Sequence, residues 1–329
     1  MTAVTPRTLP LPVLTADRLV PAEAPTIHFL GVSTGSSSIQ RVFPAWAEAL
    51  GLGEAVLQGI DLPVGAPSSD VRRIVEHVAA DPLTAGMQIT SHKVAVSEAA
   101  RDLFAERRPL ATLMDEISLV TKEPDGLHGF AKDPITGELA LDAIVPEGHW
   151  SATGANAVLL GAGGAGTALA WCLARPERGA QRPAELVVTD RDERRLQHLG
   201  ELVAAIGSDV SLRLVHVTST ADADAVVEAQ PAGSLIVNAT GLGKDLPGSP
   251  LGEQALLPED AIAWDLNYRG DLVFLGTAGG QSDRGVRIED GWTYFVHGWL
   301  QAVREVFHVD VPTAGPGFDR LSAIARSAR

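Results

Sequence analysis

The sequence predicts an α/β protein of two domains, and three observations lead to that prediction. With 329 residues, the chain has the length of about two domains. In both halves, short apolar segments alternate with amphipathic ones, as in parallel sheets whose strands are connected by helices. Near the middle, the apolar run Val158-Leu159-Leu160 leads into a glycine-rich turn.

The glycine turn is the most informative motif. Gly161, Gly163 and Gly166 stand in G-x-G-x-x-G spacing. In such a turn the first glycine bends the chain sharply, the second admits a pyrophosphate, and the third lets the helix pack closely on the strand. The next expected strand ends in Asp190, near the spacing of about 20 residues at which a carboxylate binds the ribose. These features predict a Rossmann domain that binds a dinucleotide. The alternative is a strand–helix turn that has the same glycine spacing but binds no ligand.

Composition narrows the class of function. The net charge is −15 and the basic residues form no run, which argues against a nucleic-acid or anionic-membrane partner. Cys172 is the only cysteine and no apolar segment is long enough to cross a membrane, so we expect a cytoplasmic protein without intrachain disulfides. No group of histidines, cysteines and carboxylates has metal-ligand spacing, so we expect no metal. A homodimer is a possible assembly.

The expected elements of the first half follow a proline-rich segment, residues 1–24, which is either an arm that covers another part of the molecule or a disordered extension. A strand over 26–32 leads into the loop Ser33-Thr-Gly-Ser-Ser-Ser38, whose hydroxyls either cap the next helix or bind a carboxylate or a hydroxyl-rich ligand. The further elements are a helix through Val42 and Leu50, a strand over 56–62, a helix over 69–80, a strand over 85–89, a helix over 94–107, and short strands over 113–120 and 126–130.

The second half repeats the alternation of strands and helices. After the strand over 185–190, we expect helices over 191–206 and 221–229, strands over 212–217, 234–237 and 262–266, and a long helix over 291–309. Residues 142–156 contain the prolines and glycines typical of a crossing between domains. The predicted domains are residues 1–145, completed by residues 290–329, and residues 146–289.

Lys93 is the candidate for proton transfer. It follows an expected strand end, and it is one of four lysines in a chain with 22 arginines. Oxidation of an alcohol requires a group that takes the hydroxyl proton as hydride leaves, and the reverse reaction requires that the same group donate it. A lysine can do both, whereas an arginine does not deprotonate in proteins.

Five segments, in their order along the chain, resemble the shikimate/quinate dehydrogenases. They are His92-Lys93, Gly129-Phe-Ala-Lys-Asp133, Leu160-Gly-Ala-Gly-Gly-Ala-Gly166, Val237-Asn-Ala-Thr-Gly-Leu-Gly243 and Asp265-Leu-Asn-Tyr268. The resemblance covers roughly residues 26 to 309. It implies an N-terminal α/β substrate domain, a C-terminal Rossmann domain and an oxidoreductase that transfers hydride between a nicotinamide and a hydroxylated carbocyclic acid.

The resemblance also assigns residues to roles. It implies Lys93 and Asp133 as the acid–base pair; read alone, Asp133 is equally a helix cap before Pro134. The implied substrate residues are Ser36, Ser37, Ser38, Gln88, Thr90, Ser118, Tyr268, His297 and Gln301. The implied cofactor residues are Gly161, Gly163, Gly164, Ala165, Gly166, Asp190, Arg191, Asn238, Ala239, Thr240, Gly241 and Leu266.

Several substrate positions depart from the family pattern. The two serines of the family's carboxylate clamp fall on Ser37 and Ile39 without a gap, or on Ser36 and Ser38 with a shift. The asparagine of its N-V-T segment falls on Met87 or, with a gap, on Gln88. Four further family residues differ: Ser118 replaces an asparagine, Ala131-Lys132 replace N-T, and a glutamine is either replaced by His297 or displaced to Gln301. We therefore expect a substrate other than shikimate itself, or a nucleotide-sensing protein that no longer catalyses.

The expected cofactor is NAD. Members that prefer NADP carry N-R-T where this chain has Asp190-Arg191-Asp192, and a carboxylate there repels the 2′-phosphate of NADP. Arg191, Arg194 and Arg195 keep NADP as an alternative, since any of them could reach a phosphate.

Overall fold

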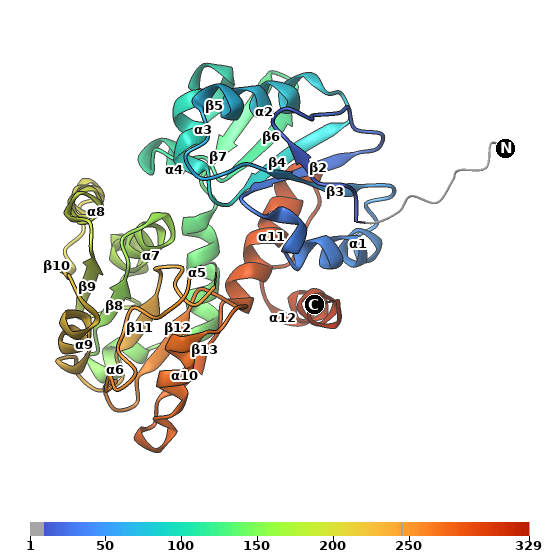
Figure 1. Cartoon of the computed structure of the whole chain (residues 1–329). Coiled ribbons are helices and arrows are strands. Elements are labelled where there is room, and N and C mark those ends of the chain that lie inside the picture. The colour runs from blue at the N-terminus through green and yellow to red at the C-terminus, as the bar shows by residue number, and fades with distance from the viewer. Residues whose placement is uncertain (1–9, 245, 329) are drawn as a thin grey trace. The chain divides into compact units, whose positions relative to one another are not determined.

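The structure is a computed structural model that describes residues 10–244 and 246–328. The chain divides into two compact units, of which the first ends at Lys132 and resumes at Gly298, and the second spans Asp133–His297. Figure 1 shows that each unit is built around one sheet. The domain bounds expected from the sequence put residues 133–145 in the first domain, whereas by its contacts the helix α5 (Asp133–Ile144) lies with the second unit, against α7 (Gly164–Ala174).

The second unit contains a six-stranded sheet in which every neighbouring pair is parallel. Its order is β10-β9-β8-β11-β12-β13, which is the 3-2-1-4-5-6 order of the Rossmann fold. The strands are β8 (Ala157–Leu160), β9 (Glu185–Asp190), β10 (Ser211–His216), β11 (Leu235–Asn238), β12 (Ile262–Asp265) and β13 (Arg287–Glu289). The helices besides α5 and α7 are α6 (His149–Thr153), α8 (Glu193–Ala205), α9 (Thr220–Glu228) and α10 (Val273–Gly279). The predicted α/β class is confirmed.

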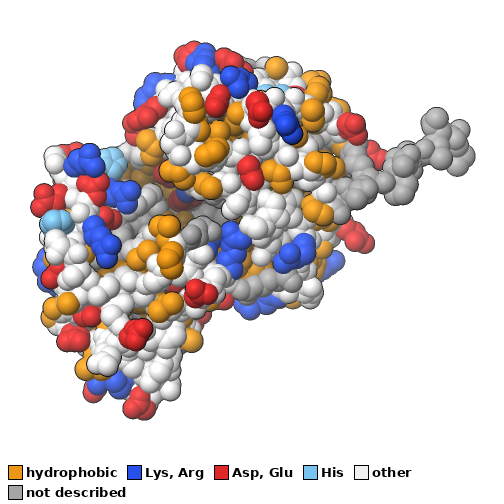
Figure 2. All heavy atoms as spheres, viewed as in Figure 1, with side chains coloured by type: hydrophobic (Ala, Val, Ile, Leu, Met, Phe, Trp, Pro, Cys, Tyr) orange, Lys and Arg blue, Asp and Glu red, His pale blue; other side chains and the backbone are white. Residues whose placement is uncertain are grey.

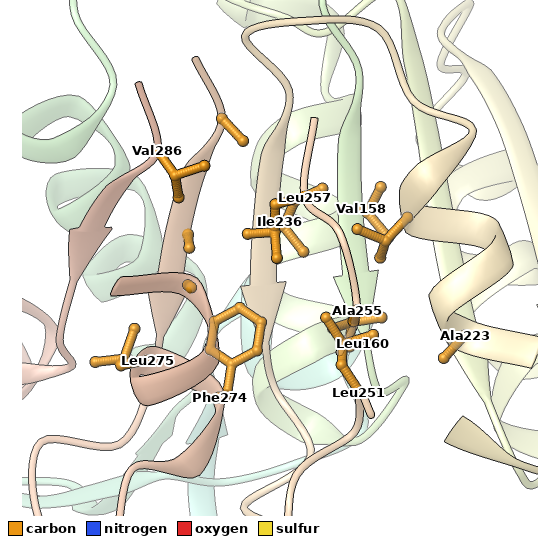
Figure 3. Close-up of a cluster of buried hydrophobic side chains, with 14 of the residues drawn as sticks. Val158, Leu160, Ala223, Ile236, Leu251, Ala255, Leu257, Phe274, Leu275 and Val286 are labelled. Atoms are coloured by element: carbon orange, nitrogen blue, oxygen red, sulfur yellow. The ribbon is translucent and has the colours of Figure 1, made fainter. Parts of the chain in front are cut away.

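The core of this unit lies between the central strands and the segments that cover them. β8 and β11 are buried at all four positions, as expected for parallel strands with both faces covered. Figure 3 shows Val158 and Leu160 of β8 beside Ile236 of β11, with Phe274 of α10 in the same cluster. Each side chain of this size contributes about 1.5–3 kcal/mol when it is fully buried. This core fixes the carboxyl ends of β8 and β11, from which the cofactor loops start.

The first unit contains a seven-stranded sheet of order β1-β3-β2-β4-β6-β7-β5. The strands are β1 (Leu14–Thr15), β2 (Thr26–Gly31), β3 (Val56–Asp61), β4 (Thr84–Ile89), β5 (Phe104–Arg107), β6 (Leu119–Glu123) and β7 (Gly126–Phe130). β1 to β4 are parallel, as the sequence predicts, but β6 runs antiparallel to both β4 and β7. The reversal occurs at Pro124-Asp125, because a two-residue connection joins only antiparallel strands.

The helices of the first unit correct two expectations. They are α1 (Ile39–Ala49), α2 (Ser68–Ala80), α3 (Lys93–Ala99), α4 (Pro109–Leu113), α12 (Gly315–Ser327) and the end of α11 (Trp292–Phe307), which begins in the second unit. The helix expected over 94–107 ends at Ala99, and residues 104–107 form a strand that pairs with β7. The strand expected over 113–120 begins only at Leu119, because Pro109 suits the first turn of a helix and starts α4.

Residues 14–15 and the helix α12 pack on the first unit. β1 pairs with β3, so residues 14–15 of the expected arm belong to the sheet, while residues 1–9 lie outside the described part. The sequence analysis missed α12, which Figure 1 shows beside α1. The indole Nε1 of Trp46 on α1 donates to the carbonyl of Leu321 on α12 at 2.9 Å.

The described surface carries charges of both signs. Figure 2 shows acidic and basic side chains interspersed on the face that it draws. Among residues 10–244 and 246–328, no helix combines the length and the apolar character required to cross a membrane.

Candidate active site and cofactor pocket

The glycine turn of the second unit has the geometry that its spacing predicts. β8 ends at Leu160, Gly161 has a φ of +109°, and α7 begins at Gly164. A Cβ atom on Gly166 would collide with the carbonyl oxygen of Gly161, so only glycine allows this approach of helix and turn. A Cβ on Gly163 would meet nothing within 4 Å, which leaves the backbone there open to a ligand. The turn therefore fits a dinucleotide pyrophosphate at the start of α7.

A pocket of about 260 Å³ opens beside this turn, wholly within the second unit. Of the predicted cofactor residues, the pocket is lined by Gly161, Gly163, Asp190, Arg191, Ala239 and Thr240. The others, Gly164, Ala165, Gly166, Asn238, Gly241 and Leu266, belong to the same turns or strand ends but do not line it. The sequence analysis missed the apolar side of the pocket, which is formed by Val217, Ala223, Leu242 and Pro250. An apolar wall opposite polar loops suits an adenine ring and its ribose.

Asp190 connects the second strand to the glycine turn. Its carboxylate accepts hydrogen bonds from the backbone N–H of Ala162 at 2.7 Å and of Asp192 at 2.9 Å. A carboxylate offers about four acceptor positions, so two remain for other donors. Since Asp190 also lines the pocket, it can accept from ribose hydroxyls without releasing the turn.

Asp192 serves the helix that follows the second strand. It stands at the N-cap of α8, where its carboxylate accepts from the backbone N–H of Arg194 and pairs with the Arg194 guanidinium at 3.0 Å. These contacts hold the pKa of Asp192 below its usual value. Asp192 is not among the pocket-lining residues, whereas Arg191 and Arg195 are. The pocket thus combines one carboxylate with two guanidinium groups.

Asn238 positions the second cofactor loop. Its side-chain oxygen accepts from the backbone N–H of Thr240 at 3.1 Å and from its hydroxyl at 2.6 Å. Its amide nitrogen donates to the Leu242 carbonyl and, at 3.0 Å, to the carboxylate of Asp265. Asp265 is fully buried, and its burial raises its pKa to about 6. Asn238 therefore shapes the loop whose residues Ala239 and Thr240 face the pocket.

The serine loop of the first unit is held by Asp61, a residue that the sequence analysis missed. The Asp61 carboxylate accepts from the backbone N–H of Thr34 at 2.7 Å and from its hydroxyl at 2.6 Å. Thr34 lies so close to β3 that a Cβ on Gly59 would collide with its hydroxyl. Thr34 and Asp61 lie 27 positions apart, so no local motif predicts this contact. The one signal in the sequence is an aspartate at the end of an expected strand.

The loop leaves Ser37 and Ser38 as the candidates for ligand binding. Ile39 is fully buried in the core, so it does not face a ligand. In the ungapped alignment, Ser37 is therefore the one serine of the clamp that this chain retains. Ser38 occupies the N-cap position of α1, but its side chain makes no capping hydrogen bond. Ser37 and Ser38 are mostly buried, while Ser36 is exposed and donates to the carbonyl of Ser33.

The end of β4 presents a buried acceptor. Met87 is fully buried and apolar, which leaves Gln88 as the polar side chain of the two alternatives. The Oε1 atom of Gln88 is buried and makes no hydrogen bond among the described residues. Thr90 follows as an exposed residue whose hydroxyl donates to the Leu30 carbonyl at 3.4 Å. An unpaired buried acceptor costs free energy unless a ligand or water supplies a donor.

Lys93 is the first residue of α3, directly after the loop that leaves β4. Its backbone carbonyl accepts from the N–H of Ile117, which brings the neighbouring Ser118 to the same edge of the sheet. His92 is buried, and its Nε2 lies 2.8 Å from the Leu62 carbonyl, so this contact holds the loop before Lys93.

The side chain of Ser118 forms hydrogen bonds with backbone groups. Its hydroxyl accepts from the N–H of Lys132 at 2.7 Å and donates to the Phe130 carbonyl at 3.4 Å. It thereby orients the segment that leads to Asp133, and a direct contact with substrate stays a prediction. Lys132 is buried, and its ammonium pairs with Glu305 of α11 at 2.6 Å, a pair that the sequence analysis did not foresee.

Asp133 begins α5 and is mostly buried. Lys93 belongs to the first unit and Asp133 is the first residue of the second, so their pairing stays a prediction from the resemblance. Tyr268 packs against the rings of Trp292 and Phe295. His297 and Gln301 lie four apart on α11, both buried, and burial lowers the pKa of His297 to about 4, so that its ring is neutral near pH 7.

Comparisons with known proteins point to one family. No protein-family model matches the chain. A shikimate dehydrogenase (NADP(+)) of Methanopyrus kandleri is 30% identical over 255 residues, which cover 76% of this chain and 79% of that protein. The solved shikimate 5-dehydrogenase of Thermus thermophilus, in complex with NADP(H) and shikimate, is 25% identical with a TM-score of 0.66, covering 92% of this chain and 99% of that one. The quinate dehydrogenase of Corynebacterium glutamicum, in complex with NAD, shares the fold at 22% identity, with the same TM-score and coverage.

Proposed function

Because this chain belongs to the shikimate dehydrogenase family, we propose that it is an NAD(P)-dependent dehydrogenase acting on a secondary alcohol or ketone of a hydroxylated carbocyclic acid. The observation that carries the proposal is the combination of an open glycine-turn pocket in one unit with Lys93 at a strand end in the other. A dehydrogenase requires both, since one holds the dinucleotide and the other handles the proton.

The residues of the second unit fit a dinucleotide. The open backbone at Gly163, the positive φ of Gly161 and the pocket beside them leave space where a pyrophosphate and an adenosine are normally bound. The nicotinamide of the bound cofactor would supply the hydride chemistry. Asn238 and Asp265 would keep Ala239 and Thr240 in place against the bound cofactor.

Lys93 and Asp133 are proposed as the acid–base pair. In oxidation the amine of Lys93 would accept the proton of the substrate hydroxyl, and in reduction its ammonium would return a proton to the carbonyl oxygen. Asp133 would orient the amine and stabilise its charged form. Ser118 supports this assignment indirectly, because its hydroxyl holds the backbone immediately before Asp133.

The substrate is proposed to be a cyclic hydroxy acid other than shikimate, or a carbocycle without its carboxylate. The fully buried Ile39 removes one serine of the ungapped clamp, while the unpaired Oε1 of Gln88 offers an acceptor for a ligand hydroxyl. A hydrogen bond missing from a buried binding site weakens binding by about 1–3 kcal/mol. Shikimate should therefore be bound less well than by a site with the complete clamp.

The preferred cofactor is proposed to be NAD. Asp190 is suited to accept from ribose hydroxyls but would repel a 2′-phosphate. Arg191 and Arg195 reduce this preference, because a guanidinium attracts the same phosphate. We expect a preference of about tenfold, which corresponds to about 1.4 kcal/mol.

A second candidate is a nucleotide-binding protein that no longer catalyses. The altered clamp and the replacement of the family's N-T by Ala131-Lys132 favour it, whereas Lys93 and Asp133 argue against it. The two functions predict the same cofactor binding and differ in turnover.

A turnover screen separates these candidates. Wild-type protein is assayed with NAD and NADP over a panel of hydroxylated carbocyclic acids and their ketones, following the absorbance of the reduced nicotinamide. Cofactor binding is measured in parallel by calorimetry. We expect turnover with at least one member of the panel and a shikimate kcat/KM below about 10⁴ M⁻¹s⁻¹. Cofactor binding without any turnover would favour the non-catalytic protein, and efficient shikimate oxidation would show that the serine loop re-forms the clamp.

A further inference from the structure

A group of potential metal ligands lies in the first unit, apart from the residues proposed for catalysis. His28 of β2, His77 in the last turn of α2, and Asp81 directly after α2 each place one ligand atom within 4.8 Å of the other two. His28 lies inside β2 and Asp81 precedes β4, whereas the candidate substrate residues Ser37, Ser38 and Thr90 follow the carboxyl ends of these strands. No residue of this group has a role in the proposed reaction.

Two of these side chains have unsatisfied nitrogen atoms. The Nδ1 of His28 and the Nε2 of His77 are buried and make no hydrogen bond among the described residues. The His28 side chain is fully buried, so water does not readily compensate for the missing partner. The other ring nitrogen of His28, Nε2, lies 3.1 Å from the hydroxyl of Thr84. Buried polar atoms without partners are rare in native proteins and often indicate an ion or a water.

The carboxylate of Asp81 retains capacity for a cation. One of its oxygens accepts from the N–H of Ala22 at 2.7 Å and from the hydroxyl of Thr84 at 3.1 Å, and the other accepts from the N–H of Leu83 at 3.0 Å. Three of about four acceptor positions are therefore occupied, and one remains. Lys122 donates to the backbone carbonyl of Asp81 and not to its carboxylate. The fixed carboxylate thus has a free position beside two imidazoles.

We propose that His28, His77 and Asp81 form a binding site for Zn²⁺. Two imidazoles and one carboxylate are a ligand set used for zinc, with water as the fourth ligand. Zinc–ligand distances of about 2.0–2.2 Å require the ligand atoms to lie about 3.3 Å apart, so the group must contract by at most about 1.5 Å. His77 is partly exposed, which gives it room to move and gives the ion a path of entry. The bound ion would connect β2, the end of α2 and the start of β4.

The site escaped the sequence analysis, which expected no metal. His77 and Asp81 are four residues apart, but His28 lies in a separate strand, and no regular motif includes all three. The packing of α2 beside β2 and β4 brings them together.

The test is zinc binding by protein without an affinity tag, after removal of metals with a chelator. Zn²⁺ is titrated by calorimetry, and the melting temperature is measured with and without the ion. His77→Gln removes one partly exposed ligand with little effect on folding, and His198→Gln is the matched control, since His198 is an exposed histidine of α8 outside the group. Asp81→Asn is a second variant, which keeps an acceptor for the backbone donors.

We expect wild type and His198→Gln to bind one zinc per chain, and both ligand variants to bind it at least tenfold more weakly. A zinc concentration of 100 times the Kd should raise the melting temperature of wild type by about 5–10 °C. Failure of wild type to bind zinc, or equal binding by His77→Gln and wild type, would overturn the proposal. Cofactor binding and turnover serve as a separate readout, because neither depends on these three residues.

Discussion

The two units of the chain keep different parts of the family pattern. In the second unit, the glycine turn and the Asn238 loop retain the expected residues, and the structure shows the backbone geometry that requires them. In the first unit, the strands around the substrate position are present, but the residues that the resemblance aligns with substrate positions differ from the family pattern, among them Ser118 and Lys132.

The difference follows from how each unit binds its ligand. A dinucleotide is recognised largely by backbone N–H groups and by close approach at glycines, so a side chain there disturbs binding whatever the substrate. A substrate is recognised by side chains at strand ends, which can change singly while the sheet persists. Four predictions, in order of decreasing effect, test this comparison.

The largest effect is expected for the lysine of the first unit. Lys93→Ala should lower kcat by about 10²-fold or more, because no proton acceptor remains for the substrate hydroxyl. Lys93→Arg should fail similarly, since a guanidinium retains its proton. Cofactor affinity, measured by calorimetry, should stay within a few-fold of wild type. Lys122→Arg is the control, and turnover of Lys93→Ala close to that of the control would remove Lys93 from the mechanism.

Substitution of two glycines of the second unit by alanine should have different effects on stability and on cofactor binding. Gly166→Ala forces a Cβ against the Gly161 carbonyl and should destabilise the protein by about 1–3 kcal/mol even without cofactor. Gly163→Ala meets no protein atom, so it should preserve the melting temperature but weaken cofactor binding. Gly276→Ala, on α10 with free space around it, is the control for both measurements. If Gly163→Ala binds the cofactor like wild type, the pyrophosphate does not approach this turn.

The serine loop tests how far the substrate site has changed. With the best substrate of the screen, Ser37→Ala or Ser38→Ala should raise KM by about 5- to 150-fold, which corresponds to the removal of a hydrogen bond of about 1–3 kcal/mol. Ser36→Ala should have less effect, because Ser36 is exposed and bonded to the Ser33 carbonyl. The exposed Ser69→Ala controls for general destabilisation. Unchanged KM in both buried-serine variants would mean that the loop does not contact the substrate.

The smallest effect concerns cofactor choice. Asp190→Asn should improve NADP binding relative to NAD by about tenfold, because it removes the charge that repels the 2′-phosphate. Asp192→Asn should leave the ratio unchanged, since Asp192 caps α8 and does not line the pocket. Tighter binding of NADP than NAD by the wild type would instead mean that Arg191 and Arg195 bind the 2′-phosphate on the ribose.

The sequence was sufficient where short-range patterns carry the information. The glycine spacing, the strand before it and the acid at the end of β9 together predicted the turn and the pocket residues Gly161, Gly163 and Asp190. Lys93 was expected at the end of the strand over 85–89, and it lies four residues after the end of β4, as the first residue of α3. These predictions succeed because the turn and the strand end are local features, determined by residues close together in the chain.

Tertiary structure alone decided the features that join distant residues. The direction of β6, the end of α3 at Ala99 and the packing of α12 on α1 depend on which partner each segment meets. Thr34 and Asp61 are 27 residues apart, and Lys132 and Glu305 are 173 apart, so no local pattern specifies their contacts. His28, His77 and Asp81 become neighbours in the same way. The physical reason is that hydrogen bonds and ion pairs depend on distances in space, which the fold sets only once the sheets and helices have packed.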